Sequence, residues 1–192
     1  SYINKVFDAI KGEVELYNLN DKGNPEIVVS LTSYPRRIKN IHLTIKSILT
    51  QDMLPGKIVL WLSNEQFPNQ LKDLPKPLTE LMSYGLEISF FDELGIRPHN
   101  KYFHAFKRYG DKIIITVDDD TVYAPNTISR LWEAHTEFPN AVCTNRMRKI
   151  RFDRKNSYLR YKKWSRPVFK KPTQSMFFTA LGYSGVLYPP GS

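Results

Sequence analysis

The sequence predicts an α/β protein, a three-layer α/β/α domain with a mainly parallel sheet. Its 192 residues are 41% apolar and 24% charged, which is the balance of a folded globular domain. Short apolar runs alternate with amphipathic stretches from residue 26 to residue 138, and polar loop pieces follow the apolar runs. This alternation is typical of parallel strands connected by helices that cover both faces of the sheet.

Each predicted strand is a short run of apolar, largely β-branched or aromatic residues bounded by turn residues. We expect four such strands, at Glu26–Leu31, Lys57–Ser63, Leu86–Asp92 and Lys112–Val117.

Helices are expected between these strands. Isoleucines recur at a spacing of three and four residues in Ile38, Ile41, Ile45 and Ile48, so a helix is predicted to begin just after Pro35 and to end before "LPG". The remaining helices are expected within 71–85, 100–110 and 126–138, with Gly85 and Gly110 at two C-terminal ends and Asn126 as an N-cap.

Three consecutive carboxylates, Asp118, Asp119 and Asp120, follow the fourth predicted strand. In parallel sheets, ligands bind beyond the carboxyl ends of the strands. Adjacent carboxylates repel one another unless a cation neutralises them, and their oxygens suit Mg²⁺ or Mn²⁺ with phosphate and water as further ligands. The triplet therefore predicts a metal site for a diphosphate; in the alternative, one Asp caps the next helix and the others are solvated.

The positive charge is concentrated in one basic segment, residues 146–171. It holds twelve Lys and Arg and a single acid, Asp153, so its net charge is +11. The net charge of the whole chain is +9, so the remaining residues together carry −2. Aromatic residues are interleaved with the cations. Such a segment attracts polyanions, namely nucleic acid, anionic lipid head groups or diphosphates, unless it is simply a solvated loop.

Two further features concern the compartment. A lone cysteine, Cys143, excludes an intramolecular disulfide and favours a reducing environment. No window approaches the roughly 18 apolar residues that a membrane helix requires. We therefore expect a cytoplasmic protein, either free or peripheral at the inner face of a membrane.

Two stretches, "VVSLTSYPRRI" (28–38) and "IIITVDDDTVYAP" (113–125), resemble the nucleotide-sugar-binding half of a type A glycosyltransferase, which has a Rossmann-like fold. The resemblance is to bacterial family 2-like sugar transferases with an Asp-x-Asp motif, which build polysaccharides. It covers roughly residues 26–125 and, more loosely, "FFTALGYSGVLYPPGS" at 177–192. It implies transfer of a sugar from a nucleotide sugar, with a UDP-sugar expected, to a saccharide or lipid-linked saccharide.

The resemblance also implies roles for individual residues. Asp118 and Asp120 would hold the Mn²⁺ or Mg²⁺ ion. The residues expected to contact the nucleotide sugar are Thr32, Tyr34, Arg37, Lys101, Asp118 and Asp119. Three of these have plain structural alternatives, since Tyr34 could pack on the sheet edge and Arg37 and Lys101 could lie on helix surfaces.

The resemblance implies one domain over residues 1–192. Residues 26–125 would be the nucleotide-sugar-binding half, and 126–192 a partial acceptor-side region that includes the basic segment. Gly182 and Gly185 would allow close backbone approach there, unless this stretch is an edge strand and turn.

The catalytic base is not assigned. The family is expected to carry an acidic motif after "GYSGVLYPP", and the sequence is expected to be truncated before it. The acids that follow Asp120 are Glu133, Glu137 and Asp153. The two glutamates suit a solvated helix face, and Asp153 suits an ion pair with its basic neighbours.

Two other classes of protein fit parts of the pattern. "DDDTV" matches the motif of haloacid dehalogenase-type phosphatases, although these place it on an early strand and add a later acidic pair. The basic segment alone would fit a nucleic-acid-binding module. In our interpretation the basic segment covers the donor diphosphate or holds the enzyme near anionic, lipid-linked acceptors, and His99 and His104 are structural.

Overall fold

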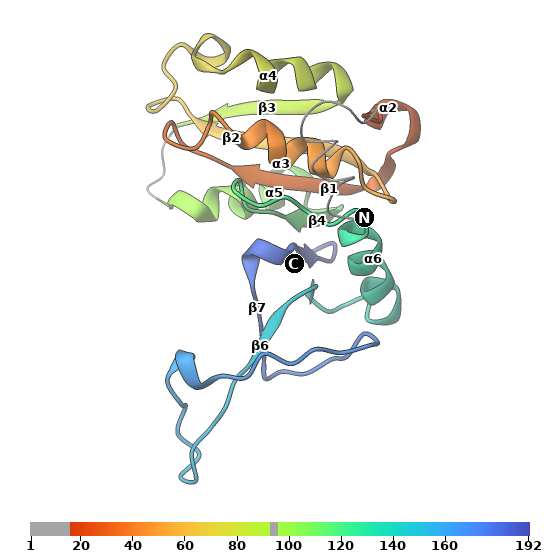
Figure 1. The fold of residues 1–192 in the computed structure, drawn as a ribbon, viewed down its shortest axis with the longest axis vertical. Helices are drawn as coiled ribbons and strands as arrows, with labels where there is room; N and C mark the ends of the chain where they lie inside the picture. Colours follow the sequence, from red (N-terminus) through yellow and green to blue (C-terminus); the bar gives the residue numbers. More distant parts are fainter. Residues whose placement is uncertain (1–15, 93–95) are drawn as a thin grey trace.

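The computed structural model describes residues 16–92 and 96–192, and its centre is a six-stranded sheet with the order β3-β2-β1-β4-β8-β5 (Figure 1). The strands are β1 (Asn24–Thr32), β2 (Pro55–Ser63), β3 (Leu86–Phe91), β4 (Ile113–Thr116), β5 (Cys143–Thr144) and β8 (Val186–Tyr188). The first four strands are parallel, whereas β8 runs antiparallel to both β4 and β5. The predicted α/β fold with a mainly parallel sheet is confirmed.

One short helix precedes β1, and the others occupy connections between the strands. The helices are α2 (Leu19–Lys22), α3 (Ile41–Ile48), α4 (Lys76–Thr79), α5 (Asn100–Tyr109) and α6 (Thr127–Glu137), with the 3-10 turns η1 (Gln70–Asp73), η2 (Glu80–Tyr84) and η3 (Arg97–His99). Gly85 ends the stretch before β3 with a φ of 99°, in the left-handed region that favours glycine. Gly110 lies at the C-cap of α5, as predicted.

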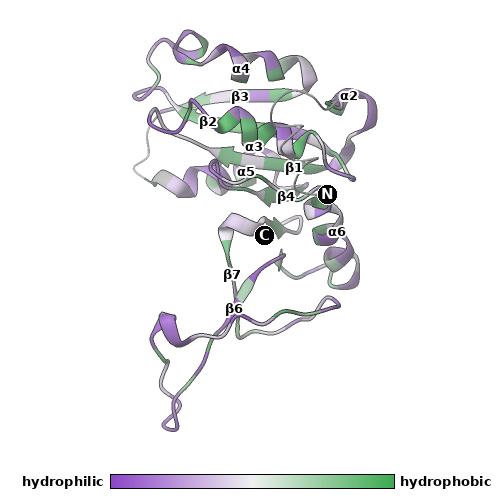
Figure 2. Ribbon diagram, viewed as in Figure 1, coloured by the Kyte–Doolittle hydropathy of each residue, from purple (hydrophilic) through white to green (hydrophobic). Residues whose placement is uncertain are grey.

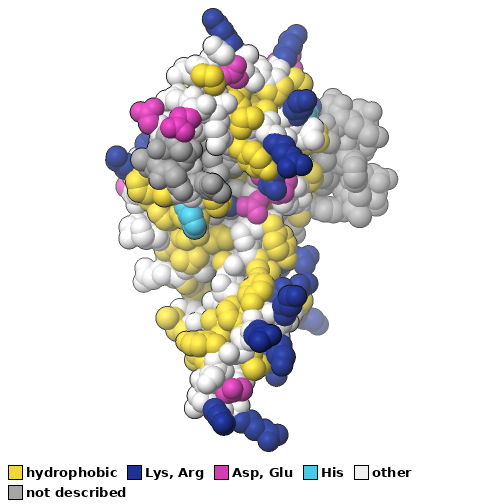
Figure 3. All heavy atoms as spheres, turned by 90° about the vertical axis from the view of Figure 1, so that its left-hand side faces the viewer, with side chains coloured by type: hydrophobic (Ala, Val, Ile, Leu, Met, Phe, Trp, Pro, Cys, Tyr) yellow, Lys and Arg dark blue, Asp and Glu magenta, His cyan; other side chains and the backbone are white. Residues whose placement is uncertain are grey.

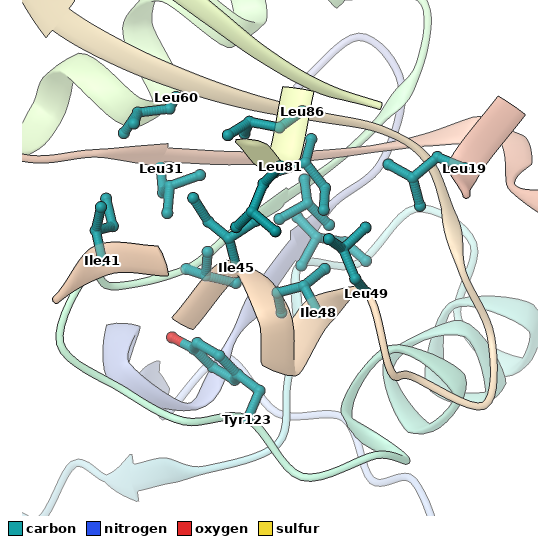
Figure 4. Packing of buried hydrophobic residues seen from close by; sticks show 14 of the residues in the cluster. Leu19, Leu31, Ile41, Ile45, Ile48, Leu49, Leu60, Leu81, Leu86 and Tyr123 are labelled. Atoms are coloured by element: carbon teal, nitrogen blue, oxygen red, sulfur yellow. The ribbon is translucent and has the colours of Figure 1, made fainter. Parts of the chain in front are cut away.

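Successive side chains of β1 point to opposite faces of the sheet, and each face has its own hydrophobic cluster. Ile27, Val29 and Leu31 belong to the larger cluster, on the face covered by α3 and α6. Val28 belongs to the smaller cluster, which includes Ala105 of α5. Successive strand side chains point to opposite faces, so a fully apolar strand requires cover on both. Figure 4 shows the isoleucines of α3 against leucines from the sheet.

Helix α3 begins at Ile41, so the prediction of a start just after Pro35 was wrong. Residues 35–40 form consecutive turns, in which the amides of Arg37 and Ile38 both donate to the carbonyl of Tyr34. Ile38 is nevertheless buried, as its place in the apolar pattern predicted. The turns therefore keep the apolar contact and bring Arg37 to the end of the sheet.

The amino end of α6 is held by a residue far away in the sequence. Asn126 occupies the predicted N-cap position, but its side chain makes no capping hydrogen bond. The amide of Ile128 instead donates to Oε1 of the buried Gln51, at 3.1 Å. Gln51 also donates to the carbonyl of Ala124 at 2.7 Å, so it joins the end of α3 to the loop that follows the acidic triplet.

The C-terminal part of the chain adds two strands to the central sheet and also forms a segment outside it. β8 lies between β4 and β5, so the alternative of an edge strand was wrong for this part of the stretch. Between β5 and β8 the chain forms a separate two-stranded sheet of β6 (Met147–Lys149) and β7 (Phe178–Ala180), with the turn η4 (Tyr161–Lys163) beyond it. We call residues 146–180 the arm; it projects below the body in Figure 1 and is largely hydrophilic in Figure 2.

One ion-pair cluster gives the fold a testable dependence on pH. Glu87 of β3 lies 3.0 Å from Lys57 Nζ and 2.5 Å from an Arg108 guanidinium nitrogen. Partial burial raises the pKa of Glu87, but the two cations outweigh this effect and lower the pKa below its ordinary value.

The stabilisation from Glu87 should therefore be complete above its ordinary pKa and lost as the pH falls through the lowered value. We expect Glu87→Gln to lower the free energy of unfolding near pH 7 by up to about 1 kcal/mol, and to have little effect near pH 3. Urea unfolding at both pH values measures this. Glu80→Gln, at a more exposed carboxylate, is the control, and an effect of Glu87→Gln that grows on acidification would contradict the assignment.

Candidate active site

The acidic triplet lies where β4 leaves the sheet, beside the loop that follows β1. Strands β1 and β4 are paired in parallel, with Ser30 opposite Thr116, and the amide of Val117 donates to the carbonyl of Ser30 at 3.1 Å. The loops after the two strands therefore emerge side by side at the carboxyl edge. This is the position at which the sequence predicted a site.

Asp119, the middle carboxylate, points inward and is 8% exposed. The Ser33 hydroxyl donates to its Oδ2 at 2.6 Å, and the Arg37 guanidinium donates to its Oδ1 at 2.9 Å. The hydroxyl of Thr44 on α3 donates to the Asp119 carbonyl at 3.0 Å. Hydrogen bonding and attraction by Asp119 raise the pKa of Arg37 above its ordinary value. Asp119 thus links β4, the loop after β1 and α3.

Asp118 is held by a buried lysine. Lys101 is 8% exposed as a residue. Its Nζ lies 2.5 Å from Oδ1 of Asp118 and 3.3 Å from the carbonyl oxygen of Val117. The backbone of Lys101 is fixed in turn, because its carbonyl accepts a hydrogen bond from the Ser30 hydroxyl, which accepts one from Trp61 Nε1 at 2.9 Å. Lys101 is therefore anchored to the sheet and is not a helix-surface lysine.

Tyr123 fixes the backbone at the start of the triplet. Its ring is 3% exposed and packs beside α3 (Figure 4), while its hydroxyl accepts a hydrogen bond from the amide of Asp118 at 2.8 Å. Burial is the main cause that raises the pKa of this phenol far above its ordinary value, so the hydroxyl remains protonated. The hydrophobic core thus sets the position of the first carboxylate.

Asp120 is the most exposed carboxylate of the three. Its side chain is 52% exposed, and its Oδ2 lies 2.9 Å from the same Arg37 nitrogen that binds Asp119. Arg37 and Lys101 supply two positive charges against three carboxylates. Among the side chains that the structure describes, one negative charge of the triplet therefore has no paired cation, on a surface where the side chain of Asp118 is also 34% exposed.

The two other predicted donor-binding residues lie at the end of β1. Tyr34 is 40% exposed, and the Arg37 guanidinium lies 5.5 Å from the centre of its ring. The Thr32 hydroxyl donates to the carbonyl of Trp61 at 2.8 Å, so it is already used within the sheet. Tyr34 is consequently an exposed ring with a guanidinium over it, whereas Thr32 holds the end of β1 against β2.

Gly182, in the turn η5 (Gly182–Ser184), lies over the Asp118–Lys101 pair. A Cβ atom at this position would be 3.7 Å from Oδ1 of Asp118 and 3.9 Å from Nζ of Lys101. The backbone of Gly182 therefore lies beside the acidic triplet, although these distances are ordinary van der Waals contacts and do not require a glycine. Gly185 has a φ of 80° and lies instead against Leu131 of α6.

The remaining candidates have structural roles. The ring of His104 packs against Trp61 and Phe91, and His99 contacts Tyr102. Glu133 and Glu137 are exposed on α6, as predicted. Asp153 was expected to form an ion pair, but its Oδ1 accepts hydrogen bonds from the backbone amides of Lys155 and Ser157. It stabilises a turn because the amides, unlike long basic side chains, are fixed within reach.

A metal ion would need ligands from outside the protein here. Within residues 16–92 and 96–192, no three His, Cys, Asp or Glu side chains are arranged to hold a metal ion by themselves. Mg²⁺ and Mn²⁺ sites often use only one or two carboxylates and complete the shell with phosphate and water. Two partly exposed carboxylates, Asp118 and Asp120, with a residual negative charge fit such a site.

Comparison with known proteins identifies the family. The model of "Glycosyl transferase family 2" matches residues 27–187, which include every residue described for the site. The chain belongs to this family. Family membership confirms the resemblance to a type A glycosyltransferase and excludes the phosphatase interpretation of "DDDTV".

Two other comparisons concern solved structures and curated proteins. Among solved structures, a mannosyltransferase from Pyrobaculum calidifontis, in complex with GDP-Man and Mn²⁺, is similar with 14% identity and a TM-score of 0.40. The match covers 66% of this family 2 chain and 37% of the mannosyltransferase chain. A search of curated proteins gave no match.

Three of the residues that build this family 2 site were missed by sequence reasoning: Ser33, Thr44 and Tyr123. Ser33 lies inside "TSYPRR", which was expected to contact a ligand, so a hydroxyl facing a carboxylate was a readable signal. Thr44 and Tyr123 gave no local signal, because each acts on a backbone group of the triplet from outside the motif.

The different environments of the carboxylates predict different effects on stability. Asp119→Ala leaves the Ser33 hydroxyl and Arg37 without their buried partner, and we expect it to lower the free energy of unfolding by about 2–4 kcal/mol. Asp120→Ala removes an exposed ion pair and should cost less than about 1 kcal/mol. Urea unfolding of the two variants near pH 7 measures the difference; equal losses would show that Asp119 is not the buried anchor.

Proposed function

We propose that this chain carries the donor site of a metal-dependent glycosyltransferase, which moves a sugar from a nucleoside diphosphate sugar to a saccharide. The observation that carries the proposal is the arrangement of the triplet: its middle carboxylate is buried, and its first and third face outward beside Arg37 and Lys101. Family 2 membership supports the reaction class.

In this proposal Asp118 and Asp120 hold Mn²⁺ or Mg²⁺ together with the diphosphate of the donor. Both carboxylates are partly exposed, and the negative charge that Arg37 and Lys101 leave uncompensated favours a cation. When bound, the metal supplies charge stabilisation for the departing nucleoside diphosphate. Asp119 does not contact the donor here; it positions Arg37 and the loop after β1.

The side chains around the triplet would orient the donor. Tyr34 offers a ring on which a uracil or another base can stack, next to the guanidinium of Arg37. Lys101 and Arg37 place two fixed positive charges at the edge where a diphosphate would lie. Gly182 lies over Asp118 and Lys101, so the turn η5 would border the donor sugar. The expected contribution of the protein is positioning and electrostatics.

We further propose a UDP-sugar as the donor and a polysaccharide or lipid-linked saccharide chain of a bacterial biosynthetic pathway as the acceptor. These finer assignments rest on the resemblance of "VVSLTSYPRRI" and "IIITVDDDTVYAP" to bacterial sugar transferases.

Calorimetric titration with nucleoside diphosphates tests the donor site. We expect UDP to bind in the presence of Mn²⁺ and to bind at least about tenfold more weakly without it, because the diphosphate completes the metal shell. Asp120→Asn should abolish the metal dependence, since it removes one of the two outward carboxylates. GDP is titrated in parallel to test whether the site prefers uracil over guanine.

The control for this titration is Asp111→Asn, which changes an exposed carboxylate outside the triplet and should bind UDP as the unchanged chain does. If neither UDP nor GDP binds with Mn²⁺, or if Asp120→Asn retains metal-dependent binding, the proposed donor site is wrong.

A further inference from the structure

The arm, residues 146–180, has no core of its own. None of its side chains is buried, although the sheet from which it projects is covered on both faces. Its internal contacts include the β6–β7 pair, two isolated bridges, backbone hydrogen bonds and paired rings such as Phe152 with Tyr158. A segment of this length with so little burial leaves most of its side chains exposed.

The charges of the arm point outward. Eleven of its twelve basic side chains are exposed, and the exception, Arg148, is stacked 4.2 Å from the ring centre of Tyr161. All ion pairs recorded within residues 16–92 and 96–192 lie in the body of the protein. The single acid of the arm, Asp153, is occupied by backbone amides. The positive charge of the arm is thus not neutralised within the described chain.

Large apolar side chains are exposed among these cations. Val168 is 95% exposed, Met176 91% and Tyr158 73%. Figure 3 shows hydrophobic side chains running down the arm with Lys and Arg along its edge and at its tip. Exposed apolar groups rimmed by charge mark an interaction surface, so the partner must offer both negative charge and an apolar phase.

We propose that the arm docks this protein on the surface of an anionic lipid bilayer. Basic side chains would bind the lipid head groups, while the exposed apolar side chains enter the boundary between head groups and acyl chains. A second copy of the chain is a poor partner, because its body carries only −2 and its arm repels the first. Nucleic acid would account for the cations and the aromatic rings, but the aliphatic Val168 and Met176 offer no stacking face.

The arm is joined directly to the candidate active site. β7 ends at Ala180, and two residues later Gly182 lies over Asp118. Docking through the arm would therefore hold the carboxyl edge of the sheet near the membrane, where a lipid-linked acceptor would be found. Membrane docking itself needs neither donor nor metal, so its test is independent of the proposed transferase function.

Vesicle co-sedimentation of the full chain tests the proposal, with phosphatidylcholine vesicles that contain about one third phosphatidylglycerol. We expect binding to these vesicles near 0.1 M salt and at least about tenfold weaker binding to pure phosphatidylcholine. The variant Lys155→Gln/Lys162→Gln/Lys163→Gln should bind anionic vesicles at least about tenfold more weakly.

Two further variants separate the arm from charge in general. Lys22→Gln/Lys72→Gln/Lys107→Gln removes the same charge from exposed positions on the body and should bind within about twofold of the unchanged chain. Val168→Ser/Met176→Ser should weaken vesicle binding with the charge intact. All these side chains are exposed, so an unchanged urea midpoint confirms that each variant is folded.

Three results would overturn membrane docking. The first is no sedimentation with anionic vesicles, and the second is equal weakening by the two triple-lysine variants. The third is a pair of observations: Val168→Ser/Met176→Ser binds vesicles as tightly as the unchanged chain, and the chain binds a single-stranded oligonucleotide more tightly than vesicles. This pair would assign the arm to nucleic acid.

Discussion

The geometry of the candidate site depends on the burial of one carboxylate, Asp119. A buried carboxylate requires partners, and this one takes a hydroxyl from Ser33 and a guanidinium from Arg37, both in the loop after β1. Its inward position turns its neighbours in sequence, Asp118 and Asp120, toward solvent. The repulsion expected within three adjacent acids is thereby reduced, because one of them is removed to the interior and two cations lie beside the others.

The hydrophobic core carries this arrangement. Tyr123 joins the packed face of α3 to the amide of Asp118, and Lys101 is tied to Ser30 in the centre of the sheet. The site is thus attached to both faces of the sheet, through α3 on one and α5 on the other. In contrast, the arm is attached only at its base and has no comparable packing. The molecule combines a rigid acidic edge with a weakly packed basic surface, and we assign the donor to the former and the membrane to the latter. No helix within residues 16–92 and 96–192 is long and apolar enough to cross a bilayer.

The sequence predicted the features that depend on local pattern. The four parallel strands, the glycine at the end of η2 and the position of the triplet follow from apolar runs and turn residues. The start of α3 could not be predicted in this way. Residues 35–40 form turns that allow Arg37 to contact acids more than eighty residues away in the sequence, and this contact leaves no local pattern. The inward position of Asp119 could not be read from three identical side chains either. The inner position of β8 was not predicted, because a strand of three residues has too short a pattern to show burial on both faces.

The central claim is that Asp118 and Asp120 bind a metal while Asp119 stays inside as an anchor. A crystal structure of the chain grown with UDP and Mn²⁺, with data collected at the manganese absorption edge, tests it most directly. We predict one anomalous peak at about 2.0–2.3 Å from carboxylate oxygens of Asp120, Asp118 or both, with Asp119 still bonded to Ser33 and Arg37. Bound UDP with the manganese peak on Asp119, or with no peak at the triplet, would contradict the account.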